Sequence, residues 1–293
     1  MVKVINYSWY LTNYNFLFVF LCCIWYNNIK EGVIIKTRYP IILVHGIVVK
    51  DFKKFKCFGK IEKVLKEQGL IVYTAKTDGF GTILSNAEQL KKYIKFVLEK
   101  ENVDKVNIIA HSKGGLDAKY MITNLDMEES VASLTTLCTP HKGSPIASKL
   151  LNLPKWLLKF ISFWINFWYK IFGDEHPDSL EVCKELKRVN LEEEDCLMIS
   201  EKVYCQSYSS KMNKSTDDFL MGIPYAFSMY FEHVETDGMV PVDSCVFGEY
   251  KGYAIDDSIS HSEIIDFMVK HKKKEKVYKF YISVCVELIK KGY

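Results

Sequence analysis

Residues 103–120, VDKVNIIAHSKGGLDAKY, decide the fold that we expect for this chain. A short apolar run at residues 106–109 is followed by small residues around Ser112 and then by a helix-compatible segment. This order predicts a strand, a sharp turn and a helix, with Ser112 at the apex. Ala110 and Gly114 leave room where such a strand and helix pass close together. The pattern therefore predicts a nucleophilic serine on a strained turn; the alternative is that Ser112 only caps the helix.

Strand-like and helix-like segments alternate on both sides of this turn. An apolar run that begins after Pro40 predicts a central strand buried on both faces. Further strands are expected at residues 70–75 and 131–137, and helices at residues 61–68 and 86–100. Such alternation is typical of a mostly parallel sheet flanked by helices. We therefore predict an α/β fold for residues 34–293.

Composition excludes several classes of protein. The 293 residues are 48% hydrophobic and 26% charged, which describes a globular chain with a sizeable core. A net charge of +3 is close to balance and gives no reason to expect nucleic acid as a partner. Nine dispersed cysteines without a CxxC pair predict neither a disulfide framework nor a zinc site, and favour reduced thiols.

The N-terminal residues 1–33 contain a separate apolar signal. Residues 16–26, FLFVFLCCIWY, form an unbroken apolar run that is short for a bilayer span and suits the core of an export signal. No small-x-small cleavage site follows the run. We therefore expect an uncleaved anchor or export signal and a membrane-associated or secreted protein; the alternative is a buried N-terminal element.

A long insertion is expected at about residues 146–197. Its centre, residues 156–172 (WLLKFISFWINFWYKIF), is apolar except for one narrow stripe at helical spacing, formed by Lys159, Ser162, Asn166 and Lys170. Such a helix should hide most of its surface. It is either a core or intermolecular-contact helix, or a mobile lid that covers a site in water and opens on a lipid surface.

A serine nucleophile needs a base and a carboxylate that orients the base. In α/β hydrolases the acid follows the serine in the chain and the histidine comes last. Asp237, in the Asp-Gly turn of ETDGMVPVDSC, is the best acid, with Asp243 and Asp256 as fallbacks. Asp237 could instead serve only as an Asx-turn residue. His261, in the polar loop SISHSEIID, has the right order, whereas His141 comes too soon after the serine.

Five motifs, YPIILVHG, AHSKGG, TPHKGSP, TDGMVP and SHSEIID, occur in this order and cover most of the chain. Together they resemble the true lipases of the α/β-hydrolase superfamily, especially bacterial triacylglycerol lipases. The resemblance implies an α/β-hydrolase fold with an apolar helical lid or cap. It also implies that Ser112 is the nucleophile, Asp237 the orienting acid and His261 the general base. The backbone amides of Ile47 and Lys113 would form the oxyanion hole.

Some members of this family hold a structural calcium ion near the histidine loop. The resemblance places Glu263 at that position, with Asp217 or Asp218 as its upstream partner. Glutamate stands where those lipases have aspartate, so its carboxylate reaches further. No cofactor for the chemistry itself is implied.

The expected activity is that of a serine hydrolase cleaving carboxylic esters of lipids through an acyl-enzyme, at a membrane or lipid-droplet surface. The apolar insertion favours a long acyl chain. An acyltransferase or a thioesterase with the same triad remains open, as does an inactive membrane-tethered binding protein.

Overall fold

A computed structural model describes residues 35–47, 56–188, 199 and 201–293. The predicted anchor at residues 1–33 lies outside the described residues, as do residues 189–197 at the end of the predicted insertion. Of the helices that the structure describes, none is both long and apolar enough to cross a bilayer.

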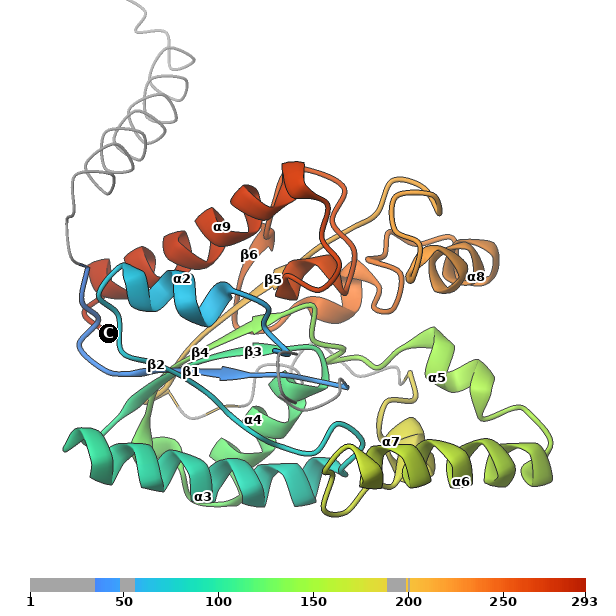
Figure 1. The fold of residues 1–293 in the computed structure, drawn as a ribbon, viewed down its shortest axis with the longest axis horizontal. Helices are drawn as coiled ribbons and strands as arrows, with labels where there is room; N and C mark the ends of the chain where they lie inside the picture. The colour runs from blue at the N-terminus through green and yellow to red at the C-terminus, as the bar shows by residue number, and fades with distance from the viewer. Residues whose placement is uncertain (1–34, 48–55, 189–198, 200) are drawn as a thin grey trace, which may run out of the picture.

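A six-stranded parallel sheet forms the centre of the molecule, with strand order β2-β1-β3-β4-β5-β6 (Figure 1). The strands are β1 (Ile41–Val44), β2 (Val72–Thr74), β3 (Val106–His111), β4 (Val131–Leu137), β5 (Tyr204–Ser209) and β6 (Glu249–Tyr253). The predicted α/β class is therefore confirmed, and four of the strands, β1, β2, β3 and β4, coincide with segments expected from the sequence.

Helices cover both faces of the sheet (Figure 1). They are α2 (Ile61–Glu67), α3 (Ile83–Glu101), α4 (Lys113–Asn124), α5 (Pro145–Leu150), α6 (Lys155–Ile171), α7 (Ser179–Glu185), α8 (Gly222–Glu232) and α9 (His271–Lys290). Helices α2 and α9 lie on one face and α3 and α4 on the other. Helices α5 to α8 extend from the end of the sheet toward which the strands point.

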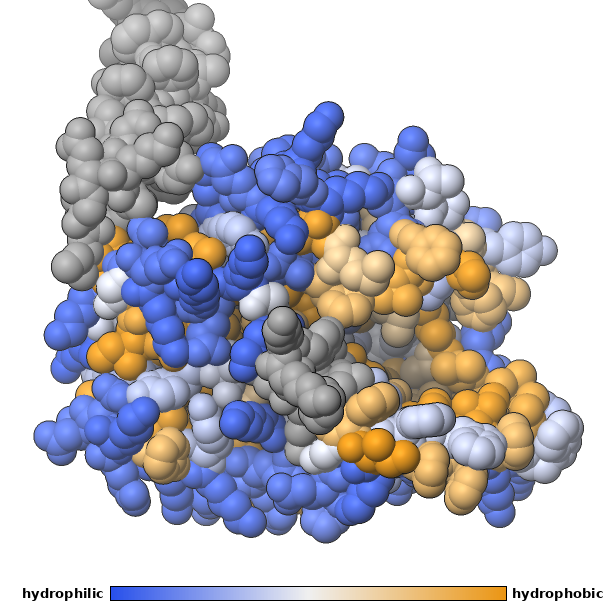
Figure 2. Space-filling view, viewed as in Figure 1, coloured by the Kyte–Doolittle hydropathy of each residue, from blue (hydrophilic) through white to orange (hydrophobic). Residues whose placement is uncertain are grey.

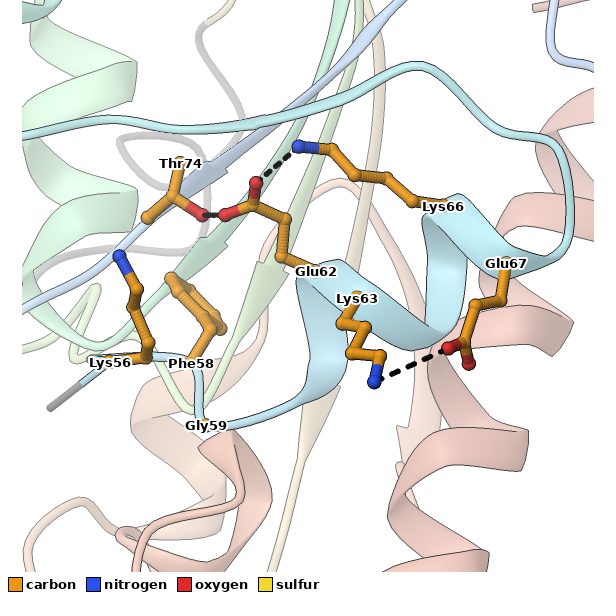
Figure 3. Close-up of a pocket in the computed structure, with 8 residues that line it drawn as sticks. All are labelled: Lys56, Phe58, Gly59, Glu62, Lys63, Lys66, Glu67 and Thr74. Atoms are coloured by element: carbon orange, nitrogen blue, oxygen red, sulfur yellow. Dashed lines mark hydrogen bonds and ion pairs between the residues drawn. The ribbon is translucent and has the colours of Figure 1, made fainter. Parts of the chain in front are cut away.

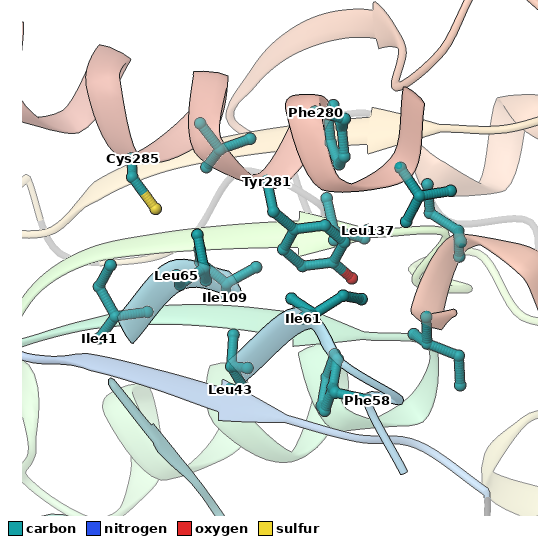
Figure 4. Close-up of a cluster of buried hydrophobic side chains, with 14 of the residues drawn as sticks. Ile41, Leu43, Phe58, Ile61, Leu65, Ile109, Leu137, Phe280, Tyr281 and Cys285 are labelled. Carbon is teal, nitrogen blue, oxygen red and sulfur yellow. The ribbon is translucent and has the colours of Figure 1, made fainter. Parts of the chain in front are cut away.

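Strand β1 shows why its sequence is apolar without interruption. Ile41 and Leu43 point into a core that contains side chains of α2 and α9, with Tyr281 at its centre (Figure 4). Ile42 and Val44 point into a second core with side chains of α3 and α4. A strand buried on both faces needs apolar residues at odd and even positions alike.

The carboxyl ends of the strands carry the residues of interest. Ser112 follows the last residue of β3, and Cys138 follows the last residue of β4. Asp237 and His261 lie in the loops after β5 and β6. In parallel α/β sheets these loops meet at one edge, so residues far apart in the sequence can form one site.

Candidate active site

Ser112 lies at the apex of the turn between β3 and α4. Its backbone has φ 54° and ψ −134°, which is costly for a residue other than glycine. Its amide donates to the carbonyl of Leu137 at 2.9 Å, and its side chain makes no capping hydrogen bond to α4. The structure therefore favours the strained-turn interpretation over the helix-cap alternative.

Two glycines allow the close approach of backbones at this turn. A Cβ atom on Gly114 would lie 2.4 Å from the carbonyl oxygen of His45. A Cβ atom on Gly46 would lie 2.7 Å from Cβ of Ser112 and 2.9 Å from the amide nitrogen of Lys113. The loop after β1 therefore packs directly on the serine turn, and Gly114 leaves room for this loop rather than for the strand that precedes Ser112.

Ser112, His261 and Asp237 form a continuous chain of hydrogen bonds. Nε2 of His261 lies 2.8 Å from Oγ of Ser112, and Nδ1 of His261 lies 2.7 Å from Oδ2 of Asp237. Because a carboxylate can only accept, Nδ1 donates to Asp237, and Nε2 is left to accept the Ser112 hydroxyl proton. The structure thus brings the three predicted residues together with the histidine between the other two.

The carboxylate of Asp237 is fully buried. Its Oδ1 atom accepts hydrogen bonds from the amides of Met239 at 2.9 Å and Val240 at 2.8 Å. Asp237 therefore forms the Asx turn and the contact to His261 at the same time, so it does not serve only as an Asx-turn residue. The fallback acids are not used: Asp243 binds Arg188 at 2.7 Å, and Asp256 is exposed.

Of the two amides predicted for the oxyanion hole, that of Lys113 directly follows Ser112, and that of Ile47 lies in the loop that packs on the serine turn. Lys113 is the first residue of α4, so its N–H has no acceptor within the helix. Ile47 directly follows Gly46, whose backbone packs on the serine turn. Neighbouring N–H groups at such a position can bind a negative charge that develops on an oxygen atom.

The side chain of Lys113 has a separate and unpredicted role. It is fully buried, and its Nζ lies 2.6 Å from Oδ1 of Asp117, one helical turn further along α4. The Asn86 amide of α3 donates to the other oxygen of Asp117 at 3.0 Å. Burial raises the pKa of Asp117, and the charge of Lys113 opposes this shift. The i, i+4 spacing of Lys113 and Asp117 was the signal available in the sequence.

His111 packs beneath the catalytic candidate His261, with ring centroids 4.5 Å apart. Burial lowers the pKa of His111 well below its usual value, and the neighbouring His261 lowers it further. The His111 ring is therefore neutral at physiological pH and places no second positive charge beside His261.

Cys138 is a residue near the site that sequence reasoning did not single out. Its Sγ lies 3.1 Å from Oγ of Ser210 and belongs to a cluster with Asp237 and His261, whose ligand atoms lie within 4.8 Å of one another. Burial, and then the charge of Asp237, raise the pKa of the Cys138 thiol well above its usual value. The protonated thiol thus contributes no negative charge beside Asp237. Its position directly before TPHKGSP and directly after a strand was the available signal.

The predicted calcium ligands do not fit an ion. Oδ2 of Asp217 accepts from two backbone amides and from the Ser258 hydroxyl, the latter at 2.5 Å. Oε2 of Glu263 lies 2.8 Å from the ammonium of Lys273, which supplies the positive charge locally. In the described part of the chain, the Cys138 cluster is the only group of at least three His, Cys, Asp or Glu residues that could hold a metal ion. Its ligand atoms lie within 4.8 Å of one another.

A hollow beside α2 lies apart from these residues (Figure 3). Its charged side chains pair with one another: Lys66 with Glu62 at 2.5 Å, and Lys63 with Glu67 at 3.6 Å. Glu62 also accepts from the Thr74 hydroxyl at 2.6 Å. None of the described residues that line the hollow is a histidine, whereas the Ser112 hydroxyl lies beside the imidazole of His261, so we place the active site at Ser112.

Known proteins resemble this chain in sequence and in fold. The sequence profile of a family described as palmitoyl protein thioesterase matches residues 40–185. Triacylglycerol lipase 2 of Saccharomyces cerevisiae is 27% identical over 263 residues, which cover 80% of this chain and 73% of the yeast protein. A triacylglycerol lipase of Pseudarthrobacter phenanthrenivorans is 41% identical over 127 residues, 41% of this chain and 38% of that lipase.

Solved structures agree on the fold. A metagenomic carboxyl esterase superposes with a TM-score of 0.65 at 15% identity, covering 87% of this chain and 77% of the esterase. The Staphylococcus hyicus lipase superposes with a TM-score of 0.63 at 14% identity, covering 86% of this chain and 95% of the lipase.

The parallel sheet, the serine turn and these likenesses together show that the chain has the α/β-hydrolase fold. The chain is a carboxylic ester hydrolase, as its similarity to triacylglycerol lipases indicates.

Proposed function

We propose that the enzyme hydrolyses long-chain acyl esters of lipids, including acylglycerols, through an acyl-enzyme on Ser112. The observation that carries this proposal is the hydrogen-bond chain from Asp237 through His261 to Ser112. The names of the yeast and bacterial relatives support acylglycerols as the substrate class.

In the first half of the reaction, Oγ of Ser112 attacks the ester carbonyl carbon while Nε2 of His261 takes the hydroxyl proton. The amides of Ile47 and Lys113 donate to the oxyanion of the tetrahedral intermediate. Asp237 accepts from Nδ1 and so stabilises the imidazolium that forms. His261 then gives its proton to the leaving alcohol, which departs and leaves the acyl group on Ser112.

In the second half, water replaces the alcohol. His261 removes a proton from the water as its oxygen attacks the acyl carbon, and the same two amides hold the second oxyanion. Collapse of this intermediate breaks the bond to Oγ, and His261 returns its proton to Ser112. The products are a fatty acid and an alcohol, and the enzyme is regenerated.

Substitution Ser112→Ala tests this assignment. We expect release of p-nitrophenol from a medium-chain ester to fall by a factor of about 10⁴ or more, because no nucleophile remains. The far-ultraviolet circular dichroism should not change, since the hydroxyl makes no capping bond. Labelling of the wild type, but not of Ser112→Ala, by a fluorophosphonate is the matched control. Retained turnover or retained labelling in the variant would remove Ser112 as the nucleophile.

A thioesterase is the second candidate, favoured by the profile match over residues 40–185. Ester and thioester cleavage pass through the same acyl-enzyme, so the leaving group decides between them. We expect kcat/KM for a palmitoyl ester to exceed that for palmitoyl thioesters when both are measured on the same vesicles. The reverse order would make thioester cleavage the principal activity, and a preference for short soluble esters would contradict the lipid assignment.

A further inference from the structure

Helix α6 exposes its apolar residues to solvent. None of its residues is buried, although the sequence led us to expect that most of its surface would be hidden. Trp156 is 71% exposed and Phe163 is 62% exposed. The other exposed large apolar residues of this helix are Phe160, Ile161, Trp164, Phe167, Trp168 and Ile171. The core-helix alternative is therefore wrong for the described residues, whereas the intermolecular-contact alternative stays a prediction.

The polar stripe of α6 explains the exposure, because its central residues face the protein. The amide of Ser179 in α7 donates to Oδ1 of Asn166 at 2.9 Å. The Ser179 hydroxyl lies 2.9 Å from the hydroxyl of Ser162. The helix thus binds its neighbour through polar groups and turns its aromatic residues outward, the reverse of an ordinary surface helix.

Buried carboxylates hold α6 in this position. Asp174, just after the helix, accepts from the amides of Gly79 at 3.1 Å and Phe80 at 2.9 Å. Asp78 in turn accepts from the amides of Glu175 at 2.9 Å and His176 at 2.8 Å. A lid movement of α6 about this end would leave these buried carboxylates unpaired, which is unfavourable. The contacts therefore indicate a fixed helix.

A second exposed apolar group lies on and beside α8. Phe219 and Leu220 precede the helix, and Ile223, Tyr230 and Phe231 lie on it; Ile223 is 82% exposed. Figure 2 shows this group and that of α6 at the same end of the molecule, on opposite sides of a hollow in its surface. This is the end at which the strands terminate and Ser112 lies.

The charge of α6 and of the residues just before it indicates which kind of surface can bind this helix. Residues 149–172 contain four lysines and no acidic residue: Lys149, Lys155, Lys159 and Lys170. A second copy docked through the same helix would bring like charges together. Tryptophan and phenylalanine flanked by lysine are typical of helices that lie in the headgroup region of a membrane. Anionic headgroups would complement the lysines.

We propose that α6 and α8 form a fixed platform, the α6/α8 platform, that docks onto a membrane surface rich in anionic lipids. The platform carries the active site to its substrate without a lid opening, so the proposal deepens the lipid-ester function and rests on it. The aromatic side chains enter the headgroup region and the lysines contact phosphates.

The five tryptophans of the chain allow a local test, because Trp156, Trp164 and Trp168 all lie on α6. The full-length Trp9→Phe/Trp25→Phe variant makes α6 the only source of tryptophan fluorescence. With vesicles of phosphatidylcholine and phosphatidylglycerol in equal parts, we expect a blue shift and quenching by brominated acyl chains. With phosphatidylcholine alone, both effects should be much smaller.

Matched variants distinguish vesicle binding through the α6/α8 platform from nonspecific hydrophobic or electrostatic binding. We expect Phe163→Gln/Ile223→Gln to weaken vesicle binding by about tenfold or more. Phe96→Gln on α3, where Phe96 is 54% exposed, should have no effect. Lys155→Gln/Lys159→Gln should reduce the preference for anionic vesicles, whereas Lys92→Gln/Lys95→Gln on α3 should not. All four variants should keep wild-type rates on a soluble ester.

Unchanged tryptophan emission while the protein cosediments with vesicles would overturn the proposal, because another segment would then bind the lipid. A dimer in solution that Phe163→Gln/Ile223→Gln converts to monomer, with vesicle binding unaltered, would also overturn it in favour of a second copy. Neither readout uses turnover, so loss of the proposed ester hydrolase activity would be recognised separately by fluorophosphonate labelling of Ser112.

Discussion

Asp237 uses its two carboxylate oxygens for different purposes. Oδ1 closes the turn through the amides of Met239 and Val240, and Oδ2 binds His261. The backbone amide of His261 also donates to the carbonyl of Asp237 at 2.9 Å. Because the acid is held by its own turn and by the backbone of the histidine loop, the imidazole has one orientation available. Residue chemistry predicted the pair, and the turn fixes its geometry.

His141 allows a prediction about pH. It is buried against Phe247, with ring centroids 4.4 Å apart, and burial lowers its pKa from 6.5 to about 3. In the unfolded chain the same ring binds a proton near pH 6.5. The stability that the neutral ring contributes is therefore complete above pH 6.5 and is lost as the pH falls toward 3.

Between pH 7 and pH 5, we expect the free energy of unfolding of the wild type to fall by about 2 kcal/mol more than that of His141→Asn. This value follows from about 1.4 kcal/mol for each pH unit below 6.5. Urea unfolding followed by circular dichroism at the two pH values measures this difference. The exposed His176→Asn variant should track the wild type. Equal losses in all three proteins would show that His141 is already protonated in the folded state.

At the scale of elements, α4 has two roles at the active site. Its first amide faces the serine turn, and its buried Lys113–Asp117 pair, through Asn86, contacts α3. A buried charge is tolerated only while its partner is present. The ion pair therefore ties the position of the serine turn to the packing of α3 against α4.

Asp117→Asn should destabilise the fold by roughly 3–5 kcal/mol, because it leaves the Lys113 ammonium buried without its counter-charge. The double variant Lys113→Met/Asp117→Asn removes both charges, and the new amide retains an oxygen for Asn86. We expect it to recover at least half of the loss in urea unfolding. A double variant no more stable than Asp117→Asn would show that the charge of Lys113 is not the cause.

Helix α6 shows what the hydrophobic periodicity of a sequence predicts about a helix and what it does not. Its sequence predicted a helix at residues 156–172, and the structure has one at Lys155–Ile171. The sequence also revealed one narrow polar stripe. Periodicity separates two faces, yet it does not say which face meets the protein, because that depends on Ser179 of α7, which comes later in the chain.

At the scale of the whole molecule, cysteine chemistry is testable. The cysteines of the described residues, Cys57, Cys138, Cys183, Cys205, Cys245 and Cys285, are all free. The dispersed spacing had favoured reduced thiols, and these six agree. Burial raises the pKa of Cys205 and of Cys285 to about 12, so both thiols stay protonated and unreactive.

We therefore expect dithiothreitol to leave the thermal unfolding midpoint unchanged. A disulfide that closed a long loop would contribute about 2–4 kcal/mol, and its reduction would lower the midpoint by several degrees. Differential scanning fluorimetry with and without dithiothreitol measures this shift, and a protein with a known structural disulfide serves as the positive control. A clear fall in the midpoint would contradict free thiols in the native protein.

The sequence by itself determined the alternation of strands and helices, the turn at Ser112 and the order of acid and histidine. These features depend on local periodicity, on small residues near the turn and on chain order, all of which can be read without coordinates. The sequence ranked Asp237 first and left Asp243 as a fallback; the tertiary structure brings Asp237 to His261 and pairs Asp243 with Arg188. It alone decided that Lys273 binds Glu263, that Lys113 is buried with Asp117, and that α6 turns its aromatic face outward. Each of these outcomes depends on side chains from different segments meeting in space, and competition among those partners is settled only when the chain is folded.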